Sequence, residues 1–229
     1  MNSVFRRFND RAQGYAELNG LQRSVARELI ARLLSKPRRI LDIGCGNGIV
    51  HSLIDWEYDL FVATDFAPQM CELHPKNEKT AVLQIDFNLP GQMLKLGGYA
   101  PFDLIISSSA LQWADDLDGT LETISQFGER AAFAIFTDGT FRELHKGKKS
   151  RLRSFEEAKH SISRAFDARF WRGEFTISFD SRRELFGYIR KCGIGGGIRM
   201  FSFKEARELI NSYPNLYLEY EVLFAVSEE

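Results

Sequence analysis

The segment Ile40–Gly48 constrains the fold of this chain more than any other part of the sequence. It reads Ile-Leu-Asp-Ile-Gly-Cys-Gly-Asn-Gly, a short apolar strand followed directly by glycines at alternate positions. Glycines let a backbone turn tightly and approach a ligand closely, and the strand before them fixes where that turn lies. A dinucleotide-binding turn, G-x-G-x-x-G, needs a glycine three residues after Gly46, where this chain has Ile49. The segment therefore predicts a cofactor loop in an α/β fold, but not a dinucleotide loop.

Asp65 is the first acidic candidate beyond the loop. It follows the apolar run 60–64, which predicts a second strand, and it stands 21 residues after Gly44. A carboxylate at the tip of that strand can accept hydrogen bonds from both hydroxyls of a ribose. The alternative is a helix cap, since Asp65 precedes a first helical turn that contains Pro68. The spacing and the position at a strand end favour the ribose interpretation.

Asp86 is the second acidic candidate and ends a third predicted strand that begins at residue 81. Its carboxylate can accept a hydrogen bond from an adenine amino group, and Phe87 beside it can pack on the adenine ring. A turn is the alternative, because Asp86 also stands shortly before Asn88 and Pro90. Taken alone, the pattern leaves both interpretations open.

Apolar runs and helical periodicities alternate along the chain, which is typical of an α/β protein with a parallel sheet covered by helices. A helix is expected over residues 20–35, where apolar residues recur at helical spacing. Further strands are expected at residues 102–107, 131–136, 174–179 and 216–226. Three pairs have the spacing of capping boxes and predict helix starts, namely Ser154 with Glu157, Ser181 with Glu184 and Ser202 with Glu205.

Composition fits one α/β domain. The chain has 229 residues, 44% of them hydrophobic, which is enough for one full core. Its net charge of −1 predicts no general attraction to nucleic acid or to a membrane surface. Three scattered cysteines and four histidines stand at no metal-ligand spacing, so we expect no metal site and a reducing cytoplasm. We also expect neither an apolar leader nor a stretch that crosses a bilayer.

The segment 107–117 follows the fourth predicted strand and is the best candidate for a substrate site. Its small polar residues, beginning with Ser107, leave space for a substrate beside the cofactor. Gln112 and Trp113 can orient a polar group there and exclude water. The alternative is structural, with Trp113 packed against the next helix and the serines acting as helix caps.

Asp42, followed by glycines two apart, resembles motif I of the class I S-adenosylmethionine-dependent methyltransferases. Several segments narrow this resemblance, namely residues 8–15 with 21–22, 41–48, 64–70 and 110–113. Together they resemble the malonyl-acyl-carrier-protein O-methyltransferases of biotin synthesis. The similarity extends to about residue 150, and the segments 141–145 and 219–223 also resemble that family, while the region between them is shorter.

The resemblance implies a Rossmann-like class I methyltransferase fold with a mostly parallel seven-stranded sheet, helices on both faces and an antiparallel final strand. It implies a single domain over residues 1–229, with a lid or substrate-recognition region at about 140–175. The cofactor is then S-adenosyl-L-methionine, which leaves as S-adenosyl-L-homocysteine. The implied cofactor-binding residues are Tyr15, Gln22, Asp42, Gly44, Cys45, Gly46, Gly48, Asp65, Phe66, Met70, Asp86, Phe87 and Ser107.

The implied reaction transfers a methyl group to the free carboxylate of a malonyl thioester on acyl carrier protein, in a cytoplasmic monomer. A carboxylate with a pKa of about 4 is already ionised at neutral pH, so no general base is needed. The protein must instead hold an oxygen roughly 3 Å from the methyl carbon and compensate the buried charge. The implied catalytic residues are Tyr15, Ser107, Gln112, Trp113 and Arg153. Arg151 and Arg199 are further candidates for a guanidinium that holds the carboxylate.

Basic residues gather around the start of the implied lid. They are Arg142, Lys146, Lys148, Lys149, Arg151 and Arg153, against a single acid at Glu143. This stretch is either a docking surface for an acidic carrier protein or only a solvated loop. Two other functions stay open: a class I methyltransferase that acts on a small acid or a quinone precursor, and a non-catalytic S-adenosylmethionine-binding regulator.

Overall fold

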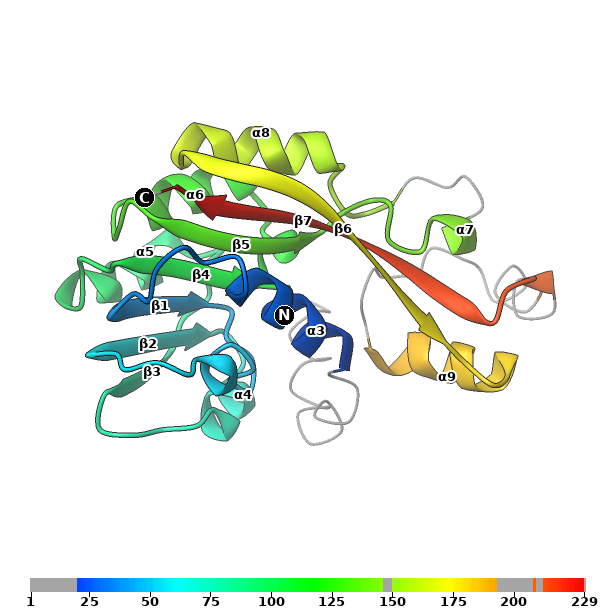
Figure 1. Ribbon diagram of the computed structural model, residues 1–229, viewed down its shortest axis with the longest axis horizontal. Helices are drawn as coiled ribbons and strands as arrows, with labels where there is room; N and C mark the ends of the chain where they lie inside the picture. Colours follow the sequence, from blue (N-terminus) through cyan, green and yellow to red (C-terminus); the bar gives the residue numbers. More distant parts are fainter. Residues whose placement is uncertain (1–19, 146–149, 193–207, 209–211, 229) are drawn as a thin grey trace.

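Figure 1 shows the computed structural model of the protein, which describes residues 20–145, 150–192, 208 and 212–228. Its centre is one sheet with the strand order β3-β2-β1-β4-β5-β7-β6. The strands are β1 (Arg39–Ile43), β2 (Leu60–Asp65), β3 (Thr80–Gln84), β4 (Leu104–Ser108), β5 (Ala131–Phe136), β6 (Ala168–Ser178) and β7 (Tyr217–Ser227). Strands β1 to β5 pair in parallel, and β7 runs antiparallel to both β5 and β6. The predicted fold class, with its antiparallel final strand, is confirmed.

Helices cover both faces of the sheet. They are α3 (Gly20–Ile30), α4 (Pro68–Leu73), α5 (Pro90–Met93), α6 (Leu117–Ser125), α7 (Arg142–His145), α8 (Phe155–Ala165) and α9 (Arg182–Cys192), with short 3-10 turns η2 (His51–Leu53), η3 (Leu94–Gly98) and η4 (Leu111–Trp113). Val25 and Leu29 of α3 belong to one apolar core with one set of strand side chains. Leu121 of α6 and Ile162 of α8 belong to a second core on the other face. The sheet is therefore buried on both sides, as its near-continuous apolar strands predict.

Some element boundaries differ from the expected ones. The helix expected over 20–35 ends at Ile30, and the strand expected at 174–179 begins earlier, at Ala168. The earlier start follows from packing, because Trp171 of β6 stacks on Phe224 of β7 with ring centroids 5.4 Å apart. The additional pairing makes both strands eleven residues long.

The predicted capping boxes are confirmed to different degrees. The capping box of Ser154 and Glu157 is complete at the start of α8. At α9 the Glu184 amide donates to the Ser181 hydroxyl at 3.2 Å, but the Glu184 carboxylate accepts from the amide of Asp180 instead. The third pair, Ser202 and Glu205, lies outside the described residues. Capping geometry was therefore predictable at α8 and only half predictable at α9.

The strand order places one crevice at the centre of the molecule. The chain builds β1, β2 and β3 outward in one direction and then returns to β4 on the other side of β1. In open α/β sheets, ligands bind at the carboxyl ends of the strands where the order reverses. Both candidate loops, after β1 and after β4, lie at this point (Figure 1). No helix in the described part of the chain is long and apolar enough to cross a membrane.

Candidate active site

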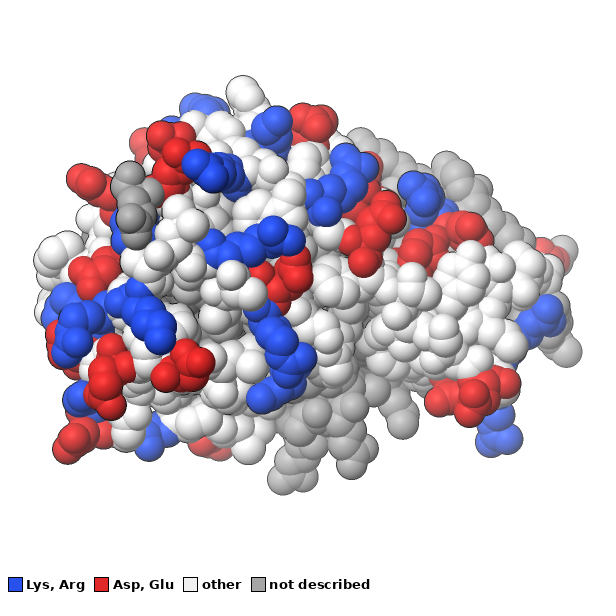
Figure 2. Space-filling view, viewed as in Figure 1, with Lys and Arg blue, Asp and Glu red and all other residues white. Residues whose placement is uncertain are grey.

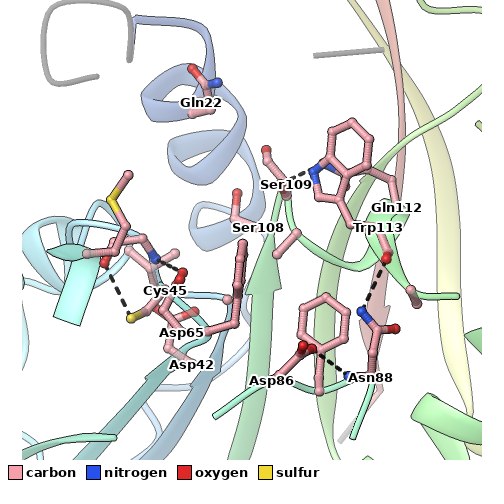
Figure 3. Close-up of a pocket in the computed structure, with 18 of the residues that line it drawn as sticks. Gln22, Asp42, Cys45, Asp65, Asp86, Asn88, Ser108, Ser109, Gln112 and Trp113 are labelled. Atoms are coloured by element: carbon pink, nitrogen blue, oxygen red, sulfur yellow. Dashed lines mark hydrogen bonds between the residues drawn. The ribbon is translucent and has the colours of Figure 1, made fainter. Parts of the chain in front are cut away.

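A cavity of about 660 Å³ lies at the carboxyl ends of β1, β2 and β4. Figure 3 shows its lining, with side chains from α3, from the loops after these strands and from the loop after β3. One wall, called here the acidic side, carries Asp42, Asp65 and Asp86. A second set of lining residues, from the loop after β4 and the segment before α8, is called here the β4 side: Ser108, Ser109, Gln112, Trp113, Arg151 and Arg153.

The glycine loop forms the floor of the acidic side. Gly44, Gly46 and Gly48 all have positive φ, at 71°, 54° and 86°. A Cβ on Gly44 would lie 2.3 Å from the Cβ of Ala110, so this glycine lets the β1 and β4 loops meet. Gly48 does not line the cavity; a Cβ there would lie 2.5 Å from Pro75 behind the loop. The first glycine therefore brings the two loops together, and the last one packs the loop from below.

Asp65 anchors this loop to β2. It is 7% exposed, and its carboxylate accepts from the amide of Gly46 at 2.9 Å and from the amide of Ala67 at 2.8 Å. Burial raises the pKa of Asp65 to about 6, and the two amides oppose that rise. The helix-cap alternative is not what forms, because the N-cap of α4 is Ala67. The carboxylate faces the cavity, which leaves the ribose interpretation as a prediction that this geometry permits.

Asp42 has no such support. It is 1% exposed, and neither carboxylate oxygen has a hydrogen-bond partner among the described residues. Burial, with a smaller contribution from the charge of Asp65, raises the pKa of Asp42 well above its usual value. A buried carboxyl group without donors is costly unless a ligand supplies a cation or hydrogen-bond donors. Asp42 therefore marks the position where a cationic group of a ligand would be stabilised.

The β4 side also presents polar atoms that have no partner among the residues the structure describes. They are the hydroxyl oxygens of Ser108 and Ser109 and the Oε1 of Gln112. The Oε1 of Gln22, on α3, is a further unpaired atom at this cavity. Gln112 is fixed by its other end, since its Nε2 donates to the carbonyl of Ser109 at 2.6 Å. Several adjacent orphan groups in one cavity indicate a ligand-binding site, since buried polar groups are normally paired.

The two arginines at this wall differ in their bonding. Arg153 donates through Nη2 to the carbonyls of Ala114, at 2.7 Å, and Asp115, at 3.3 Å. Arg151 is exposed, lines the same cavity and has no hydrogen-bond partner in the described part of the chain. Arg153 therefore holds the end of η4 beside the cavity and keeps its remaining donors, whereas no described residue holds Arg151 in the same way.

Most predicted site residues meet at this cavity. Its lining includes Gln22, Asp42, Gly44, Cys45, Gly46, Asp65, Phe66, Met70, Asp86, Phe87, Gln112, Trp113 and Arg153. Ser107 does not line it, because its side chain is fully buried and its hydroxyl donates to the carbonyl of Ile43 at 2.7 Å. Tyr15 and Arg199 lie outside the described residues.

Ser108, Ser109 and Asn88 line the cavity although the sequence interpretation did not name them as site residues. The miss at the serines has a physical origin. Side chains alternate between the faces of a strand, but Leu104, Ile105 and Ile106 are all buried, so no polar and apolar alternation shows which serine faces the cavity. The position directly after the last apolar residue was not enough to choose among three consecutive serines.

The acceptor-rich acidic side fits S-adenosylmethionine. That cofactor carries a sulfonium, an ammonium, two ribose hydroxyls and an adenine amino group, all of which are cationic or donate hydrogen bonds. Asp42, Asp65 and Asp86 supply carboxylate acceptors in this cavity, and both oxygens of Asp42 lack a partner among the described residues. This fold and this site are typical of the class I S-adenosylmethionine-dependent methyltransferases.

Comparison with known protein families also indicates a methyltransferase. The family model described as a methyltransferase domain matches residues 18–190, so the chain belongs to the methyltransferase domain family. Solved structures show the same fold at low identity. A methyltransferase from Haloferax volcanii, in complex with the Trm112 activator, matches with a TM-score of 0.60 at 17% identity over 99% of each chain. The plantazolicin methyltransferase BpumL matches with a TM-score of 0.53 at 13% identity, over 98% of this chain and 96% of that one.

Curated relatives share a more specific name. A malonyl-[acyl-carrier protein] O-methyltransferase of Magnetococcus marinus is 36% identical over 152 residues, covering 58% of this chain and 52% of the relative. One from Anoxybacillus flavithermus is 32% identical, covering 61% and 55%. The chain thus spans about half the length of these relatives. Another from Chlorobium phaeovibrioides is 26% identical over 230 residues, covering 93% and 88%.

Proposed function

We propose that this protein transfers a methyl group from S-adenosylmethionine to the free carboxylate of malonyl-acyl carrier protein, in an early step of biotin synthesis. The observation that carries the proposal is the cavity with two chemically different walls. Its acidic side offers carboxylate acceptors, and its β4 side offers hydroxyls, an amide and two guanidinium groups. The names of the relatives support the identity of the acceptor.

The acidic side would hold the cofactor, which supplies an electrophilic methyl group when bound. Asp65 would accept from the ribose hydroxyls, and Asp86 with Phe87 would bind the adenine edge and ring. Asp42 would compensate positive charge at the methionine end. Gln22 of α3 lines the same cavity with an Oε1 that has no partner among the described residues, and Tyr15, outside those residues, stays a predicted cofactor-binding residue.

The β4 side would hold the acceptor. The malonyl carboxylate is ionised at neutral pH, so the chain's residues need to orient it and offset its desolvation, not remove a proton. Arg153 is the proposed partner, because its guanidinium is already fixed by two carbonyls and a fixed fork loses less entropy on binding a carboxylate. Gln112 and Trp113 would close the remaining wall and exclude water.

The carrier protein is proposed to dock beside the cavity mouth. Arg142 and Arg151 are both exposed in this region, and Arg151 also lines the cavity. Lys146, Lys148 and Lys149, the other members of the basic stretch, lie outside the described residues. An acidic carrier helix would be attracted to this surface at low salt. The lid or substrate-recognition region predicted at about 140–175 overlaps the sheet, because β6 begins at Ala168. We further propose that the part of this region before β6 recognises the substrate, in a monomeric cytoplasmic enzyme.

Incorporation of labelled methyl from S-adenosylmethionine tests the function. Malonyl-acyl carrier protein is compared with free malonate and with malonyl-coenzyme A, each at low and high salt. We expect base-labile label on the carrier, formed much faster than on either other acid and slowed by salt. Salt-insensitive methylation of a small acid would favour the small-molecule alternative. Cofactor binding without transfer to any of the three acids would contradict the malonyl assignment.

A further inference from the structure

Ser109 has an unusual backbone conformation at the end of β4. Its φ is +62°, in the left-handed region that favours glycine. The conformation is held on both sides, since the Ser109 amide donates to the carbonyl of Ala134 at 2.8 Å and its carbonyl accepts from Gln112 at 2.6 Å. A non-glycine residue kept in a sparsely populated conformation is a signal of function, because glycine would adopt that turn at lower cost.

The Ser109 side chain does nothing visible for the fold. Its hydroxyl oxygen is buried and has no hydrogen-bond partner in the described part of the chain. Figure 3 shows Ser109 beside Ser108 on the β4 side, with Gln112 and Trp113 beyond it. By contrast, the hydroxyl of Ser107 bonds to Ile43 and ties β4 to β1. The strained residue therefore lines the cavity and carries a hydroxyl without a partner among the described residues, and the unstrained one stabilises the sheet.

We propose that Ser109 is a substrate-binding residue whose hydroxyl donates a hydrogen bond to the carboxylate that receives the methyl group. This inference rests on the function proposed above and names how the same site recognises its acceptor. A hydroxyl donor and a guanidinium on one wall can bind the two oxygens of a carboxylate separately. Arg153 would hold the carboxylate oxygen that does not react. Ser109 would bind the other oxygen and so limit rotation of the carboxylate about its bond to the rest of the malonyl group.

The simpler interpretation is that Ser109 is only a turn residue. Serine tolerates turns, and a hydroxyl that bonds its own backbone would explain it. The unpaired Oγ argues against this, since no bond from the hydroxyl to its local backbone forms. The two interpretations predict opposite effects of glycine, which removes the hydroxyl and relieves the backbone at once.

Binding of malonyl-pantetheine to protein saturated with S-adenosylhomocysteine tests the inference without methyl transfer. The variants are Ser109→Gly and Ser109→Ala, with Ser125→Ala as the control, because the Ser125 hydroxyl only bonds the helix carbonyl of Glu122. We expect about tenfold weaker malonyl-pantetheine binding in both Ser109 variants. S-adenosylmethionine affinity should stay within about twofold of wild type, and Ser109→Gly should unfold at a higher temperature.

Acetyl-pantetheine, which lacks the carboxylate, separates recognition of the charge from recognition of the thioester. It should bind all variants equally. Wild-type malonyl-pantetheine affinity in Ser109→Gly, or an equal loss for acetyl-pantetheine, would overturn the role of Ser109 while leaving the proposed function in place. Wild-type protein that binds S-adenosylmethionine but no malonyl ligand, on pantetheine or on the carrier, would overturn both.

Discussion

The two walls of the cavity are built by different means. On the acidic side the backbone does most of the work: the amides of Gly44 and Cys45 bond to the carbonyl of Thr64, and Asp65 bonds two further amides. On the β4 side, the hydroxyls of Ser108 and Ser109 and the Oε1 of Gln112 have no partner among the described residues, whereas on the acidic side only Asp42 has such unpaired oxygens. A wall made of backbone can change little without loss of the fold, whereas a wall made of side chains can be altered one residue at a time. This contrast fits a common cofactor and a variable acceptor.

Charge distribution shows a similar contrast at the surface. Figure 2 shows acidic and basic side chains interspersed over the face in view, with no large area of one sign among the atoms drawn in colour. This agrees with the net charge of −1. The proposed recognition of an anionic substrate would therefore depend on local basic residues, such as the arginines at the β4 side, more than on the net charge of the protein.

The largest expected effect comes from Gly44, where the two walls touch. Gly44→Ala places a Cβ 2.3 Å from that of Ala110 at a φ of +71°. We expect a loss of about 2–4 kcal/mol in the free energy of unfolding and roughly 100-fold weaker S-adenosylmethionine binding. Thermal unfolding and calorimetric titration measure both.

Gly46→Ala is the matched control for Gly44→Ala. Gly46 also has positive φ, at 54°, but a Cβ there meets nothing within 4 Å. It should lose only about 1 kcal/mol, from the backbone conformation alone. The matched readout is stability, because Gly46 itself lines the cavity and its substitution can also affect S-adenosylmethionine binding. If the two variants lose equal stability, the close contact between the β1 and β4 loops does not hold the two sides together.

The acidic side should also give S-adenosylmethionine binding a pH dependence. Hydroxyl donors favour the ionised Asp65 carboxylate, whose pKa in the free protein is about 6. Affinity should therefore be full above pH 7 and fall about tenfold by pH 5. The stability of the free protein has the opposite sign: because this pKa is raised, the stability decreases as pH rises from about 4 to about 6. Titration calorimetry at several pH values, with thermal unfolding in parallel, measures both trends.

Affinity that is constant between pH 5 and pH 7 would mean that Asp65 does not bind the ribose in its ionised form. Asp42 should add to proton release on binding, since its pKa is also raised and a cationic ligand would lower it. Titrations in buffers with different ionisation enthalpies count the released protons. Asp42→Asn should reduce that count, while release that is unchanged in this variant would show that Asp42 is not coupled to the ligand.

The acidic side was also the part that sequence could predict. The glycine spacing, Asp42 and Asp65 stand at fixed distances along the chain, because a strand, a tight turn and a second parallel strand leave little freedom between them. The sheet was predictable for the same reason, since buried strands such as Ala131–Phe136 are continuous apolar runs. The loop spacing and the apolar strands are both local patterns, formed by residues close together in the sequence.

The β4 side was harder to predict because its geometry comes from contacts between distant residues. Ser107, Ser108 and Ser109 differ only in direction, and the left-handed turn that turns Ser109 to the cavity depends on Ala134 and Gln112. The bond from Arg153 to Ala114 joins residues 39 apart in sequence. No local pattern reports such a bond, so the sequence offered several arginines and could not choose among them.

Substitution of the two arginines tests whether they have different roles, Arg153 as the carboxylate partner and Arg151 as an exposed charge. Arg153→Met should raise the KM for malonyl-acyl carrier protein about tenfold and lower the stability by about 1 kcal/mol, since it loses both a carboxylate partner and two carbonyl bonds. Arg151→Met should raise the KM only about threefold, through a loss that disappears at high salt. Steady-state kinetics at two salt concentrations measure both.

The outcome for the arginines has two informative alternatives. A larger, salt-independent loss in Arg151→Met would make the exposed guanidinium the carboxylate partner and leave Arg153 as a positioning residue for η4. Equal effects of the two variants would show that the wall acts through its total charge. In either case S-adenosylmethionine affinity should stay unchanged, because neither guanidinium belongs to the acidic side.

The smallest expected effect concerns how the segment that carries Arg153 is held. Ser154 follows directly and caps α8, with its hydroxyl accepting from the Glu157 amide at 3.2 Å. Ser154→Ala should cost about 1 kcal/mol of stability, as loss of an N-cap usually does. Malonyl binding should change less than twofold, because the guanidinium of Arg153 is fixed by the carbonyls of Ala114 and Asp115, not by the helix. Ser163→Ala, which removes an exposed hydroxyl within α8, is the control for stability. If Ser154→Ala weakened malonyl binding as much as Arg153→Met, then α8 would hold the β4 side, and that wall would depend on secondary structure as much as the acidic side does.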